Sequence, residues 1–136
     1  MSAHNDSFPW MSYYGNYRFF EDRMRSHSRV TGVRNIGDGL YEINLTDGRR
    51  LIVFICDCYS YGIAEYYESV EKLGDLNAVV INSNWCGYTM DAKLRCREHK
   101  VGLFDIRGFM ASLSLSNYWE YLTEEENKYL KKKDLI

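Results

Sequence analysis

The chain has 136 residues and a mass of 16.1 kDa, the size of one ordinary domain. Its 46% hydrophobic and 26% charged residues exclude a disordered chain, and one Pro with ten Gly excludes a collagen-like or low-complexity one. The longest uncharged apolar run, Leu51 to Cys56, is far shorter than the roughly 18 residues that span a bilayer. Because the start lacks the basic and apolar regions of a secretory signal, we expect a cytoplasmic protein that has no contact with membranes.

Apolar spacing predicts a first helix over about Asn16 to His27, with Tyr13, Tyr17, Phe20, Met24 and His27 along one face. Glycines at 32, 37 and 39 indicate a break after it. A β-hairpin then follows, with arms at 40–45 and 51–58 and a turn at Asp47-Gly48. The second arm is almost continuously apolar, which is typical of a strand buried on both faces, so we expect it at the centre of its sheet.

The second half alternates between helices and strands. We expect a helix at about 62–73, a buried strand in NAVVINSN, a helix capped by Thr89 at about 90–100, a strand in VGLFDI and a short helix at about 108–115. Alternation of this kind implies right-handed crossovers and a partly parallel sheet with helices packed on it. The prediction is a single α/β domain over 1–136, with a mixed central sheet whose core includes Val53, Ile55, Val79 and Ile81.

The charges and the aromatic residues give two indications about partners. The net charge is −2, but residues 18–50 hold seven Arg against five acids, and 91–107 hold five bases against three acids. These segments are compatible with nucleic-acid contact or, more simply, with solvated surface. Aromatic residues gather at both ends of the chain, where they suggest either packing on the domain or, as we prefer, a homo-oligomer interface. They are Phe8, Trp10, Tyr13, Tyr14, Tyr17, Phe19 and Phe20 at the start, and Tyr118, Trp119, Tyr121 and Tyr129 at the end.

The cysteines and histidines offer little chemistry in this pattern. Cys56 and Cys58 form one close pair, but Cys86 and Cys96 are ten residues apart, so buried thiols are a better interpretation than structural zinc. His99 follows Cys96 by one helical turn, which suggests either a Cys–His pair or a histidine at a helix end. We favour the helix end.

Two stretches resemble a known family. LNAVVINSNWCGYTMDAKLRCREHKVGLFDIRGFMASL and FFEDRMRSHSRVTGVRNIGDGLYEINLTDGRRLIVFICDCYSYGIAEYYESVEKLG are similar to Mrr-like restriction endonuclease domains of the PD-(D/E)xK superfamily. The resemblance covers about 17–115 and leaves aromatic-rich extensions at 1–16 and 116–136. It implies a restriction-endonuclease-like fold, in which a mixed sheet with a hairpin is flanked by helices.

The resemblance also implies where a nuclease site would lie. Such enzymes hold Mg²⁺ with an acidic residue at the hairpin and another on the central strand, and a Lys two residues later assists the attacking water. The hairpin acid falls on or beside Glu42, with Tyr41 and Asp38 as neighbours, and the strand acid falls on Phe54, Ile55 or, after a slip, Asp57. The lysine position falls on Cys56, Cys58 or Tyr59, so no alignment of the strand supplies a lysine. Glu21 matches a helix glutamate found in some of these enzymes.

The sequence therefore predicts an inactive restriction-endonuclease-like domain that acts as a binding or assembly module, with nucleic acid or a protein as its partner and no cofactor. The alternative is an active Mg²⁺-dependent DNA nuclease that uses Glu21, Glu42 and Asp57 as catalytic residues, with Glu42 and Asp57 as metal ligands.

Overall fold

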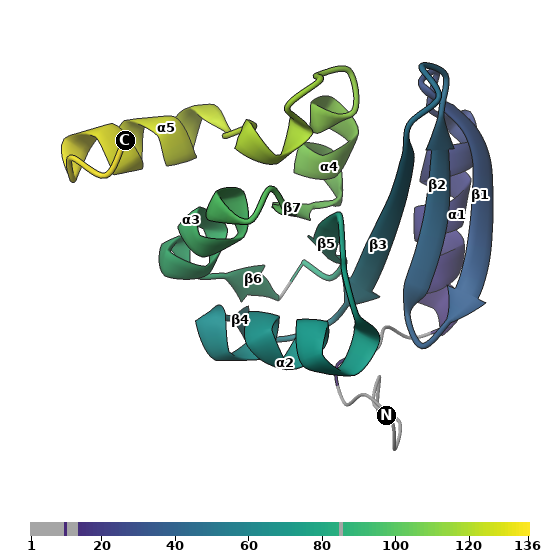
Figure 1. The fold of residues 1–136 in the computed structure, drawn as a ribbon, viewed down its shortest axis with the longest axis horizontal. Coiled ribbons are helices and arrows are strands. Elements are labelled where there is room, and N and C mark those ends of the chain that lie inside the picture. Colours follow the sequence, from purple (N-terminus) through teal and green to yellow (C-terminus); the bar gives the residue numbers. More distant parts are fainter. Residues whose placement is uncertain (1–9, 11–13, 85) are drawn as a thin grey trace.

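A computed structural model describes residue 10, residues 14–84 and residues 86–136, with side chains from residue 17 in the first helix (Figure 1). Its centre is a sheet of five strands in the order β1-β2-β3-β5-β7. The strands are β1 (Val30–Gly37), β2 (Leu40–Leu45), β3 (Arg50–Cys56), β5 (Ala78–Ile81) and β7 (Gly102–Asp105). β1, β2 and β3 are antiparallel neighbours, whereas β3, β5 and β7 run parallel. The predicted α/β fold with a mixed central sheet is confirmed.

Helices cover both faces of the sheet. On one face α1 (Tyr14–Ser26) and α4 (Ile106–Ser112) pack against alternate strand residues such as Tyr41, Val53 and Ile55. On the other face α2 (Ile63–Leu73) and α3 (Met90–Glu98) pack against Phe54, Cys56 and their neighbours. A small parallel sheet of β4 (Ser60–Tyr61) and β6 (Gly87–Tyr88) lies beside α2 and α3. The chain ends in a 3₁₀ helix, η1 (Tyr118–Glu120), and in α5 (Glu124–Lys132).

The central position of β3 follows from its sequence. Its residues from Val53 to Cys56 are fully buried, and β2 and β5 pair with its two edges. The predicted core residues Val53, Ile55, Val79 and Ile81 are all buried, which confirms that part of the prediction. The strand ends at Cys56 rather than at Cys58. Among the helices of the described ranges, none is long and apolar enough to cross a membrane.

The first strand corrects the sequence interpretation of residues 30–37. Gly32 does not break the chain but pairs with Asn44 of β2, and the pairing is irregular between Val30 and Gly32. The true break is the turn at Gly37-Asp38-Gly39, where all three residues have positive φ. At Gly39 the backbone also lies against the Phe54 ring, only 2.9 Å from where a Cβ would stand, so this position requires glycine.

Three of the four C-terminal aromatic residues pack on their own domain, whereas Tyr129 is 44% exposed. Tyr118 is buried in the core under α1 and α4, its hydroxyl donates to the carbonyl of Asn77 (3.0 Å), and Trp119 and Tyr121 pack against the same core. For these three rings the structure shows the first of the two interpretations, packing on the domain. Of the N-terminal rings, Phe8 and Tyr13 lie outside the described residues, as does the Tyr14 side chain. Self-association itself stays a prediction.

Two boundaries and one helix in the last third of the chain also differ from the prediction. Helix α3 ends at Glu98 rather than Lys100, and α4 begins at Ile106, where the Asp105 side chain caps it through the backbone N–H of Gly108 (2.7 Å). Helix α5 was not expected. Its start carries a reciprocal cap between Thr123 and Glu126, a pattern that the sequence shows and that apolar spacing alone did not reveal.

Candidate functional site

Glu42 lies on β2 between two arginines. By strand register its neighbours are Arg34 on β1 and Ile52 on β3. Nε of Arg34 donates to Oε1 of Glu42 at 2.9 Å, and NH1 of Arg50 donates to Oε2 at 2.7 Å. The carboxylate is almost buried, whereas the two arginine side chains remain 65% and 63% exposed. Glu42 thus fixes two guanidinium groups on an open part of the sheet.

The charge state of Glu42 follows from this arrangement. The hydrogen bond from Arg34, and then that from Arg50, hold the pKa of the carboxyl below its ordinary value, against an opposing effect of burial. The carboxylate is therefore ionised at neutral pH, and both of its oxygens are already engaged by cations. A metal ion at Glu42 would have to displace these two arginines.

Glu21 lies on the opposite face of the sheet. The Tyr41 hydroxyl donates to Oε2 of Glu21, and Tyr41 packs in the core under α1. Because successive strand residues point to opposite faces, Glu42 points away from this core and towards the side of α2. The structure therefore does not bring Glu21 and Glu42 together. The pKa of Tyr41 is raised, first by burial and then by its bond to Glu21, so its hydroxyl stays protonated.

Asp57 follows β3 and sits at the carboxyl end of the parallel strands. Its Oδ1 accepts a hydrogen bond from the Ser83 hydroxyl (2.5 Å), and its backbone N–H donates to the carbonyl of Trp10 (2.8 Å). By register, Glu42 pairs with Ile52, five residues before Asp57 along β3. The three candidate acids thus lie at three separate places.

The central strand provides an apolar surface where a nuclease needs ligands. Its residues Phe54, Ile55 and Cys56 are fully buried, and the strand contains no lysine. Within residue 10 and ranges 14–84 and 86–136, no three Asp, Glu, His or Cys side chains form a group that could hold a metal ion. The residues of β3 therefore pack the two layers of helices against the sheet.

The thiols of the buried cysteines are poor nucleophiles. Burial raises the pKa of Cys58 to about 11 and that of Cys96 to about 12, so both stay protonated at neutral pH. His99 is the C-cap residue of α3, and its ring lies tilted against the Tyr66 ring, with centroids 6.1 Å apart. The favoured interpretation, a histidine at a helix end, fits this position.

A polar cleft lies at the carboxyl ends of β5 and β7. It encloses about 330 Å³ and is lined by Asn82, Ser83, Asn84, Asp105 and Arg107, together with Ile81, Cys86 and Ile106. Asp105 and Arg107 also line a second cavity of about 430 Å³, whose other wall is the start of α5. Polar side chains at this edge of a parallel sheet are a common setting for ligands.

The sequence pointed to Glu42 and Asp57 but missed the partners that define their roles. The pairing of Arg34 with Glu42 requires β1, which the glycines concealed. The sequence does contain an indication of this pairing, because Arg34 lies eight residues before Glu42 and Arg50 lies eight residues after it. Comparison of the chain with protein-family models, curated proteins and solved structures finds no match.

Proposed function

We propose that this chain is a restriction-endonuclease-like domain that does not cleave and that binds nucleic acid through the open face of β1, β2 and β3. A helix, antiparallel strands, a central strand, a crossover helix and a parallel strand follow one another in the order that the family resemblance implies. This succession supports the fold part of the proposal.

The observation that carries the function is the pairing of Glu42 with Arg34 and Arg50. In a nuclease of this class the hairpin acid would bind a metal ion. Here its two oxygens accept hydrogen bonds from two guanidinium groups, and Ile52 lies opposite it on the next strand. A metal-binding role is therefore replaced by a role in positioning cations.

The same pairing suits phosphate binding. Arg34 uses only Nε and Arg50 only NH1 for Glu42 in these hydrogen bonds, so other N–H groups of each guanidinium can face an external anion. Arginine binds phosphate oxygens in a two-pronged geometry, and a fixed side chain loses less entropy on binding than a free one. The triad carries one net positive charge, so we expect weak, salt-sensitive contact that does not depend on base sequence.

We expect no detectable cleavage of supercoiled plasmid by the purified protein with Mg²⁺ or Mn²⁺. The reason is that Glu21, Glu42 and Asp57 lie apart and that β3 has no lysine. Agarose gels of the plasmid, with the Glu42→Ala and Asp57→Ala variants in parallel, measure this. Cleavage by the wild-type protein that both substitutions abolish would establish the alternative nuclease instead, whereas cleavage that survives both would come from a contaminant.

We expect the double variant Arg34→Ala/Arg50→Ala to bind a fluorescein-labelled oligonucleotide about tenfold more weakly at low salt, as measured by fluorescence anisotropy. Loss of two phosphate contacts should also reduce the slope of log affinity against log salt by about 2. The matched control is Arg18→Ala/Arg23→Ala, which removes the same charge from α1, and its affinity should change little. Equal loss in both double variants would mean that only net charge matters, and absence of binding by the wild type would refute the proposal.

A further inference from the structure

Lys93 is a buried cation that belongs neither to the arginine pair around Glu42 nor to the candidate metal ligands. It lies on α3 with its side chain fully removed from solvent, and its Nζ donates to the carbonyl of Leu103 at 2.6 Å. The Phe104 ring lies 4.0 Å from Nζ and the Tyr88 ring 5.6 Å. An ammonium group in such surroundings is costly unless a counter-charge lies close by.

That counter-charge comes from α5. Oε1 of Glu126 lies 4.0 Å from Nζ of Lys93, and the Tyr88 hydroxyl donates to Oε2 of Glu126. The backbone N–H of Thr123 also donates to Oε1, at 3.0 Å, so the same carboxylate caps the helix and joins it to the domain. The second anchor of α5 is Leu130, which is fully buried.

The start of α5 lines the 430 Å³ cavity. Thr123, Glu125 and Glu126 form one wall of the 430 Å³ cavity, and Tyr88, Asp105, Arg107 and Gly108 belong to the body of the domain. In Figure 1, α5 (yellow) runs along the outer edge of the molecule beside α3, beyond the helices that cover the sheet. Release of α5 would therefore leave the sheet intact while exposing Lys93, Tyr88 and the carboxyl end of β7.

We propose that α5 is a latch whose closing depends on the proton carried by Lys93. When α5 is closed, Lys93 is buried, and when α5 opens, water reaches its ammonium group. Glu126 on α5 supplies a counter-charge at 4.0 Å, but the loss of water around the ammonium has the larger effect. Closing is therefore easier once Lys93 has lost its proton, and α5 opens more as the pH falls towards 8.

The surroundings of Lys93 determine the pH range. The pKa of Lys93 is lowered to about 8, mainly by burial and also by Arg97 on the same helix, and this value already includes the opposing effects of Glu126 from α5, Cys96 from α3 and Asp105 at the end of β7. With α5 open, the pKa returns towards the ordinary value of 10.5. The open state then binds more protons than the closed state between these two values, so closing strengthens as the pH rises through 8 and is independent of pH well below it.

Hydrogen exchange measured by mass spectrometry on the full chain tests the latch. After correction for intrinsic exchange rates, we expect the opening constant of the 124–132 peptide to be flat from pH 6 to 7 and to fall about tenfold from pH 7 to 9. The α2 peptide, 63–73, serves as the internal control and should not change. If both peptides change together, Lys93 is exposed only by global unfolding, and the latch is refuted.

Two variants separate the roles of the pair. Lys93→Met keeps the apolar contacts and removes the charge, so α5 should stay closed with no dependence on pH. Glu126→Gln removes the counter-charge that raises the pKa of Lys93, so α5 should open more wherever Lys93 is protonated, and the fall in opening should begin at a lower pH. A pH dependence that persists in Lys93→Met would assign the effect to another group and would overturn the proposal.

Discussion

Replacing Phe20 with alanine is expected to lower the free energy of unfolding by about 3–5 kcal/mol, the usual cost of removing a fully buried aromatic ring. The Phe20 ring lies edge-on to Tyr41 of β2, with centroids 5.2 Å apart, and 6.3 Å from the Phe109 ring of α4. Its loss would open a cavity where α1, the sheet and α4 meet, and the neighbouring rings are too well packed to fill it.

Urea denaturation followed by circular dichroism measures this cost. The neighbouring residue supplies the control, because Phe19 is 43% exposed and Phe19→Ala removes the same ring from the outer side of the helix. We expect that variant to lose less than about 1 kcal/mol, since surface substitutions cost little. Similar losses in both variants would contradict the packing of α1 described above.

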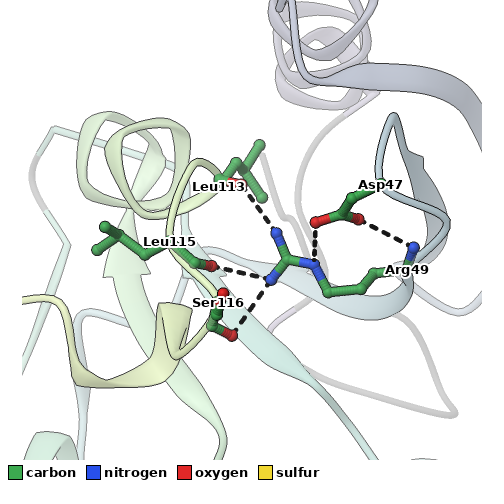
Figure 2. Close-up of polar contacts among 5 residues, drawn as sticks. All are labelled: Asp47, Arg49, Leu113, Leu115 and Ser116. Atoms are coloured by element: carbon green, nitrogen blue, oxygen red, sulfur yellow. Dashed lines mark hydrogen bonds and ion pairs between the residues drawn. The ribbon is translucent and has the colours of Figure 1, made fainter.

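Replacing Arg49 with alanine is expected to cost about 1.5–3 kcal/mol of the free energy of unfolding, the usual range for hydrogen bonds made by a charged group. Figure 2 shows its guanidinium reaching from the β2–β3 turn to the chain after α4. NH2 donates to the carbonyl of Leu113 at 3.1 Å, and NH1 donates to the carbonyls of Leu115 (2.9 Å) and Ser116 (3.4 Å). Nε meanwhile donates to Asp47 at 2.7 Å, which holds the side chain in place.

Two further variants examine this contact. Arg49→Lys keeps the charge, but a single ammonium cannot reach all three carbonyls, so it should recover only part of the stability. Arg18→Ala removes an exposed arginine from α1 and should stay within about 0.5 kcal/mol of the wild type in the same urea titration. Full recovery by lysine would show that charge alone, without the fork of N–H groups, holds the turn.

The sequence predicted those elements that are specified by residues close together in the chain. The apolar run of β3, the Asp47-Gly48 turn and the Thr89 cap each lie within a few residues and appear where expected. Strand β1 was missed because Gly32 resembles a break, and only its pairing with Asn44 of β2 makes it a strand residue. Tertiary contact overrides local preference most readily at glycine, which accepts almost any backbone conformation.

The candidate site was predictable only in part. Glu42 was a candidate because of its place in the hairpin. Its role, however, depends on its ion pair with Arg34, which lies on β1, the strand that was not recognised in the sequence. Nothing in the sequence near Arg49 indicates its role, because the carbonyls that it binds are 64 to 67 residues away. The Lys93–Glu126 pair likewise joins α3 to a helix that was not expected.

The change of strand direction at β3 has a consequence for the order in which the chain can assemble. The three antiparallel strands are joined by tight turns, so residues 30–56 can pair as soon as they have been synthesised, with little loss of chain entropy. The far edge of β3 must wait for β5, which comes only after the whole of α2. Until then Phe54 and Cys56 have no cover and an apolar strand edge is open, which makes this interval the one in which the nascent protein is most exposed to aggregation.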